Sequence, residues 1–144
     1  MIPTLNKVKK GGGFSFNFIS KDGKINKKKW IKFVDNVKNF NVSYGGPEGI
    51  KINKDFFNYF KEKEQVALLW HEYHHARKKV FTFGRNCEEF RADKYSALKN
   101  SIEDCLSYLK IGEKLYDEKI IPYDPKKHPP IKKRIERIEK LRVK

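Results

Sequence analysis

The spacing of hydrophobic and polar residues changes along the chain, and each change predicts a different element. Phe14–Ile19 alternates apolar and polar residues with a period of two, which is typical of a half-buried β-strand. Between Asn26 and Phe40 the apolar residues recur at helical spacing, which predicts a helix capped by Asn26. Residues 41–49 contain three glycines and a proline and are expected to form a loop, after which Ile50–Ile52 is a second short strand.

Helical spacing dominates the middle of the chain. Asn53 can cap a short helical turn that carries three phenylalanines, Phe56, Phe57 and Phe60. A longer helix is expected from about Lys63 to Lys79. Its apolar residues lie on several sides, so we expect this helix to be central in the fold.

Three more helices are expected after Gly84. Asn86 can cap a helix from Cys87 to about Lys99, and Ser101 can begin the next one. Residues 121–130 are punctuated by prolines and are expected to form a loop. The last helix is marked by apolar residues on one face of a highly charged segment: Ile131, Ile135, Ile138 and Leu141.

These elements predict a single α+β domain over residues 1–144, mostly helical, with a small sheet from residues near 14–19 and 50–52. Residues 1–13 are basic, end in three glycines and are expected to form a flexible start. No apolar run approaches the roughly 20 residues of a membrane span, and the N-terminus lacks the apolar core of a signal peptide. We therefore expect a soluble, cytoplasmic protein.

The net charge of +15 is concentrated at the two ends of the chain. Residues 1–40 carry ten basic and two acidic residues, and residues 119–144 carry ten and three, whereas residues 41–118 carry 13 of each. Basic ends attract acidic partners, including nucleic acid. The alternative is that the lysines only solubilise the surface, which we favour because no nucleic-acid motif accompanies them.

Candidate chemistry lies in the near-neutral middle. His71, Glu72 and His75 have the order His-Glu-x-x-His within the expected helix 63–79. Residues four apart are about one turn apart, so both imidazoles lie on one face. This spacing lets two neutral imidazoles bind one Zn²⁺ while the glutamate accepts a proton from the attacking water. His74 lies on another face and is expected at the surface or behind a ligand.

A third metal ligand is expected from the next helix, because Glu88 and Glu89 both lie at its start. Asn86 and Glu89 also fit a capping box, which would use the same carboxylate for a structural purpose. Spacing alone leaves Glu88 and Glu89 both open. The chain has no Cys-x-x-Cys pattern, so a disulfide scaffold is not expected, and Cys87 remains an alternative donor.

Two further segments carry a resemblance to a known family. Glu89–Ala97 resembles the Glu-x-x-Ala-Asp-x-x-Ala segment of the gluzincin metallopeptidases that include the HtpX-type heat-shock proteases and the CAAX prenyl endopeptidases. His128–Ile135 resembles the same family's His-Pro-Pro-x-x-x-Arg-Ile/Leu segment. The resemblance covers roughly residues 50–140. It departs from the family in lacking transmembrane helices and in placing His74 where a small residue is common.

The resemblance implies a zincin-like metallopeptidase fold and a role for each matching residue. Glu89 would be the third zinc ligand, and Asp93 would orient a ligating histidine. His128 and Arg134 would approach the metal from the far side and stabilise the oxyanion. The ordinary alternatives are a surface acid for Asp93, a loop histidine for His128 and one more helix cation for Arg134.

The sequence therefore predicts a zinc-dependent metalloendopeptidase acting on a peptide or protein substrate. A second interpretation is an anti-repressor peptidase resembling the ImmA/IrrE type, which the Ala92-Asp93 and His128-Pro129-Pro130 segments disfavour. A third is a basic protein that binds nucleic acid or an acidic assembly and whose metal site is structural or vestigial. This third interpretation predicts that the protein binds DNA or RNA with an affinity that depends strongly on salt, and that its function does not depend on Glu72.

Overall fold

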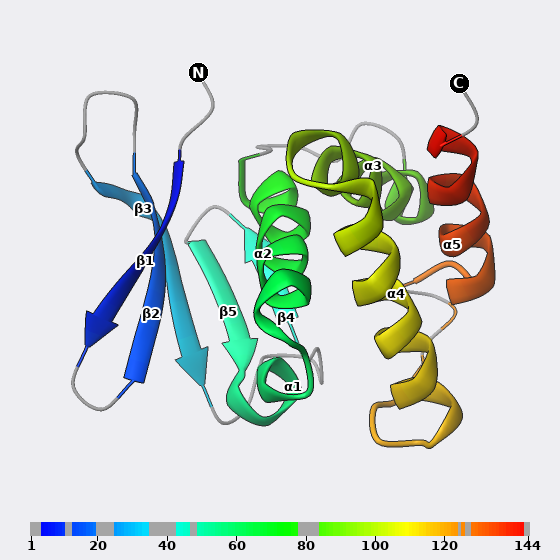
Figure 1. Cartoon of the computed structure of the whole chain (residues 1–144), viewed down its shortest axis with the longest axis horizontal. Helices are drawn as coiled ribbons and strands as arrows, with labels where there is room; N and C mark the ends of the chain where they lie inside the picture. The colour runs from blue at the N-terminus through cyan, green and yellow to red at the C-terminus, as the bar shows by residue number, and fades with distance from the viewer. Residues whose placement is uncertain are drawn as a thin grey trace.

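The chain forms a sheet first and then a group of helices, an α+β architecture (Figure 1). The computed structural model describes residues 4–10, 13–19, 25–34, 43–46, 49–77, 84–123, 125 and 128–142. Within this part of the chain, more residues are helical than extended, as expected. No described helix has the length and apolar character that would let it span a bilayer.

The sheet has five strands in the order β1-β2-β3-β5-β4. They are β1 (Thr4–Lys10), β2 (Gly13–Ile19), β3 (Ile25–Val34), β4 (Ser43–Gly46) and β5 (Gly49–Asn53). β3 and β5 are parallel, with Ile31 opposite Ile50 and Phe33 opposite Ile52. The other neighbours are antiparallel. The expected strands at 14–19 and 50–52 are confirmed, although β3 lies between them in the sheet.

Three expectations for the first third of the chain are wrong. Residues 26–40 were expected to be helical, yet Ile25–Val34 is strand β3; residues 35–40 lie outside the described part. The helical spacing of Trp30, Phe33 and Val34 also suits a strand, because aromatic and β-branched residues favour a pleated surface. Parallel pairing with β5, a contact that local spacing does not reveal, decides the outcome.

The other two errors concern the edges of the sheet. Residues 4–10 of the expected flexible start form strand β1, which pairs with β2 along its whole length. Ser43–Gly46 of the expected loop 41–49 forms strand β4. It is antiparallel to β5, and Gly46 lies opposite Gly49. A glycine-rich segment is typical of a loop, yet pairing with β5 makes Ser43–Gly46 a strand.

The helices follow the expected order. They are α1 (Lys54–Asn58), α2 (Glu62–Arg77), α3 (Gly84–Lys99), α4 (Ile102–Asp117) and α5 (Ile131–Glu139), followed by the 3₁₀ helix η2 (Lys140–Arg142). Asn53 caps α1 by accepting a hydrogen bond from the Phe56 amide at 3.0 Å, and Ser101 caps α4 by accepting one from Asp104 at 3.1 Å. α3 begins at Gly84, so Asn86 lies inside it and the predicted capping box is wrong.

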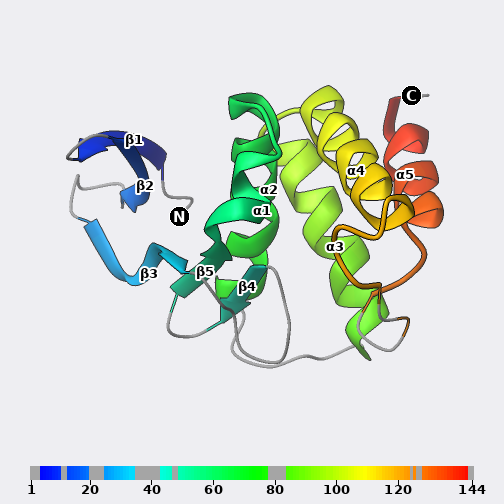
Figure 2. The same ribbon diagram turned by 90° about the horizontal axis from the view of Figure 1, so that it is seen from below.

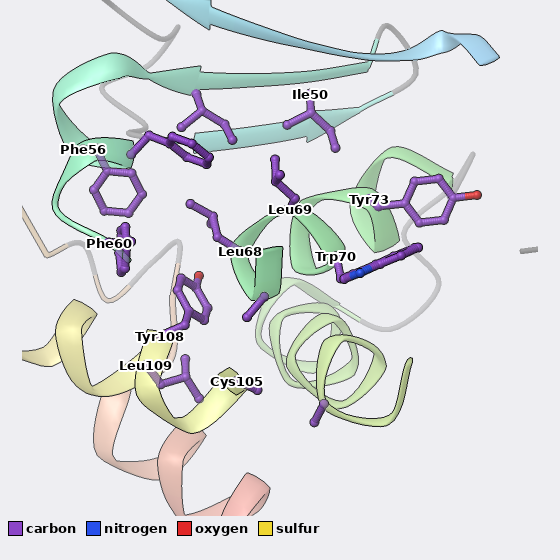
Figure 3. Close-up of a cluster of buried hydrophobic side chains, with 14 of the residues drawn as sticks. Ile50, Phe56, Phe60, Leu68, Leu69, Trp70, Tyr73, Cys105, Tyr108 and Leu109 are labelled. Carbon is purple, nitrogen blue, oxygen red and sulfur yellow. The ribbon is translucent and has the colours of Figure 1, made fainter. Parts of the chain in front are cut away.

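Helix α2 is the centre of the fold, as its apolar pattern predicted. It lies between the sheet and the pair α3 and α4, and α5 packs outside them (Figures 1 and 2). Ten consecutive residues, Ala67–Ala76, are buried. Figure 3 shows Leu69 directed at Ile50 of the sheet, while Tyr108 and Leu109 of α4 approach from the opposite side. A helix covered on all sides fixes the position of every side chain that it carries.

We predict that Leu69→Ala lowers the free energy of unfolding by about 2–5 kcal/mol, because it leaves a cavity between α2 and the sheet. Leu98→Ala is the matched control: Leu98 is also helical but 61% exposed, and its loss should change stability by less than about 0.5 kcal/mol. Urea denaturation followed by circular dichroism measures both. Equal losses would contradict the central position of α2.

Candidate metal centre

One turn of α2 brings His71, Glu72 and His75 together. The imidazole rings of His71 and His75 have centroids 4.9 Å apart. One potential ligand atom from each of these three residues lies within 4.8 Å of the other two, and all three side chains are buried. The spacing of the motif therefore produces the expected cluster, inside the protein rather than on its surface.

Helix α3 adds Glu89 to this cluster. Its carboxylate oxygens Oε2 and Oε1 lie 3.1 Å from Nε2 of His71 and 3.1 Å from Nε2 of His75, respectively. Glu88 instead lies on the His74 side of α2, with Oε2 3.5 Å from Nε2 of His74. Of the two adjacent glutamates that spacing left open, Glu89 is therefore the one that faces both motif histidines.

A hydrogen bond between helices fixes α3 against α2. The hydroxyl of Ser96 donates to the backbone carbonyl of Ala67 at 2.7 Å, and both residues are fully buried. Glu89, Asp93 and Ser96 follow one another at spacings of four and three, so they lie on one face of α3. This spacing can be read from the sequence, but the spacing alone does not predict that Ser96 binds the backbone of α2.

Asp93 connects the cluster to the last helix. Its Oδ1 lies 2.8 Å from Nδ1 of His71, so this nitrogen can donate to the carboxylate and leave Nε2 directed at Glu89. Arg134 of α5 donates to both oxygens of Asp93, from Nε to Oδ2 at 2.7 Å and from Nη2 to Oδ1 at 2.8 Å. The predicted contact between Asp93 and a motif histidine is thus present.

Arg134 pairs with Asp93, and the oxyanion role that the resemblance implied stays a prediction. Its guanidinium is buried behind Asp93, and Nη2 lies 3.9 Å from Oε2 of Glu89. Two of its nitrogens are committed to Asp93, which suits a residue that holds the ligands rather than one that stabilises an oxyanion. The pairing of Arg134 with Asp93 could not be predicted from local spacing, because the two residues are 41 positions apart.

The remaining candidate residues are placed as follows. His128 is half-buried, and its backbone carbonyl accepts a hydrogen bond from the Tyr123 hydroxyl at 3.1 Å; its expected role at the metal stays a prediction.

His74 is buried between α2 and α3 rather than at the surface. Cys87 belongs to α3, but its side chain lies outside the described part. Cys105 of α4 is buried.

Burial and charge act in opposite directions on the titrating groups. Burial lowers the pKa of His71, but the charges of Glu89 and Asp93 outweigh it and raise that pKa to about 10. Burial also raises the pKa of Glu89 and Asp93, and the nearby cations more than reverse this, so both carboxylates are held below their usual range. For Glu72 burial prevails, and its pKa is raised despite the two histidines.

These residues fit a divalent cation. Glu89 Oε2 is buried and makes no hydrogen bond within the described structure, although His71 Nε2 lies 3.1 Å away. Glu72, Glu89 and Asp93 bring three carboxylates to one buried place, and Arg134 brings one permanent positive charge. With both histidines neutral, as metal ligation requires, these groups sum to two negative charges, which a divalent ion would balance. Two imidazoles and one carboxylate are also a donor set that transition metals accept.

The chain was compared with known proteins. No family model matches it, and no curated protein and no solved structure match it either. The fold class therefore rests on the described strands and helices, and the candidate metal centre rests on the contacts given above.

We predict that Arg134→Met destabilises the protein by about 3–5 kcal/mol, because it leaves the buried carboxylate of Asp93 without its bidentate partner. Lys133→Met is the control, since Lys133 is the exposed neighbour on the same helix and its loss should cost little. Urea unfolding of both variants gives the difference. A cost for Arg134→Met no larger than that of the control would show that Asp93 does not depend on this pair.

Proposed function

We propose that the chain is a zinc-dependent metalloendopeptidase in which His71, His75 and Glu89 bind Zn²⁺ and Glu72 is the general base. The observation that carries this proposal is the position of the Glu89 carboxylate, with one oxygen 3.1 Å from each motif Nε2 atom. A His-Glu-x-x-His helix and a carboxylate from the following helix form the ligand set of the gluzincin type that the sequence resembles.

The bound ion would supply Lewis acidity, which lowers the pKa of water and polarises a peptide carbonyl. The protein's own groups do the rest. Glu72 accepts a proton from the attacking water and returns it to the leaving amine, a role that suits a carboxylate whose pKa is raised by burial. Asp93 holds His71 through Nδ1, so that Nε2 keeps its direction toward Glu89.

Arg134 is a positioning residue in this proposal. By donating two hydrogen bonds to Asp93, it fixes the carboxylate that in turn fixes His71. The bidentate geometry also keeps Asp93 ionised in a buried place, where a lone carboxylate would take up a proton. The same contact links α5 to α2 through α3, so folding of the last helix supports the metal ligands.

The first prediction of this proposal separates the two adjacent glutamates. Wild-type protein should bind about one zinc per chain, and Glu89→Gln should lose most of it, because a neutral amide is a poor zinc ligand. Glu88→Gln makes the same chemical change one residue away, against His74, and should retain zinc. Elemental analysis after dialysis measures the content. Equal zinc in the two variants would remove Glu89 from the ligand set.

The second prediction concerns Glu72. Glu72→Gln should keep its zinc but lose peptide hydrolysis by about 100-fold or more, since the amide cannot accept the proton of water. A library of fluorogenic peptides incubated with zinc-loaded wild type identifies a cleaved sequence, on which the variant is then assayed. Circular dichroism controls for folding. Undiminished hydrolysis by zinc-loaded Glu72→Gln would rule out the proposed general base.

A further inference from the structure

A groove lies between α3 and α5, outside the metal centre. It is open at the surface and encloses about 530 Å³, within the range of about 300–1,000 Å³ that is usual for ligand sites. α3 and α5 contact each other, and α5 lies at the end of the molecule away from the sheet (Figures 1 and 2). The lining comes from the middle of α3 and from the last turn of α5 with η2.

The rim of the groove is positively charged. Arg91 and Lys94 lie three apart on α3, and Arg137 of α5 and Lys140 of η2 lie three apart on the opposite side, so each side of the groove carries two cations. All four residues are exposed. No acidic residue lines the groove, and within the described chain no carboxylate forms an ion pair with Lys94 or Lys140. Four like charges around one opening favour an anionic occupant.

The floor of the groove is apolar. Phe90 and Leu141 are half-buried there, and Ile138 is buried beneath them. The guanidinium of Arg137 lies over the Phe90 ring, 3.8 Å from its centre. This cation–π contact covers a face that a nucleobase would need for stacking, so an apolar floor with a covered aromatic ring suits aliphatic side chains better than bases.

We propose that this groove binds an acidic protein segment that also carries apolar side chains. Carboxylates of the segment would pair with Lys94 and Lys140 on the two sides of the groove, and its apolar residues would pack on Phe90 and Leu141. A groove between two helices with an apolar floor and charged sides is a common way to recognise a peptide. The proposal gives the basic C-terminal part of the chain a specific partner chemistry.

The groove does not depend on the metal centre. Glu89 and Asp93 project from α3 toward the motif histidines, whereas Phe90 and Lys94, each one position later, line the groove. One position along a helix is a rotation of about 100°, so the two sets of side chains lie on different faces. Binding in the groove can therefore be measured in Glu89→Gln protein as well as in wild type.

The test uses four fluorescent probes and the full chain. One is a short helical peptide of glutamates interrupted by leucines, and a second has serine in place of each leucine. The others are single-stranded DNA of similar charge and vesicles containing anionic lipid. We expect the leucine peptide to bind most tightly and its affinity to fall with added salt. Tighter binding of DNA or of vesicles would overturn the proposal, and so would equal binding of the serine peptide.

Charge reversal locates the binding site. Lys94→Glu with Lys140→Glu should weaken binding of the leucine peptide by about tenfold or more, because two rim attractions become repulsions. Lys110→Glu with Lys114→Glu makes the same change at two exposed lysines of α4 that do not line the groove, and should bind nearly as wild type does. Equal weakening in both double variants would show general charge attraction and would overturn the proposed site.

Discussion

The fold requires that the ionisable side chains buried in and around helix α2 find polar partners inside the protein. Ten consecutive residues of α2 are buried, and four of them are His71, Glu72, His74 and His75. Water cannot solvate these groups, so each must meet a partner from a neighbouring helix. α3 supplies Glu88, Glu89 and Asp93, and α5 supplies Arg134 through Asp93. The helices that complete the core are thus the ones that complete the site.

Much of the site could be predicted because its spacing is local. His71, Glu72 and His75 lie on one turn, and Asp93 lies one turn beyond Glu89, so helical geometry brings each set together. Glu88 and Glu89 could not be separated in this way, because the choice depends on how α3 is rotated against α2. The role of Arg134 could not be predicted either, since its contact with Asp93 spans 41 positions and forms only when α5 packs.

The same distinction explains the outcome for the fold. The five helices α1 to α5 were predicted because apolar spacing is local, and the caps of α1 and α4 were predicted from Asn53 and Ser101; only the start of α3 was placed too late. β3 was mistaken for a helix because Trp30, Phe33 and Val34 satisfy both spacings and only the partner strand β5 decides between them. β1 and β4 were missed at basic or glycine-rich segments, which sequence patterns associate with loops. Long-range pairing therefore accounts for the error at β3, whereas β1 and β4 pair with the next strand in the chain and were missed because of their composition.

The proposed zinc site consists of two histidines and a glutamate and contains no cysteine. X-ray absorption at the zinc edge of the zinc-loaded wild-type protein tests this ligand set, because it distinguishes nitrogen and oxygen ligands from sulfur. We predict two imidazoles with the remaining ligands oxygen, at about 2.0–2.2 Å, and no sulfur at about 2.3 Å. A sulfur ligand, or a protein that retains no zinc to measure, would contradict the assignment of His71, His75 and Glu89.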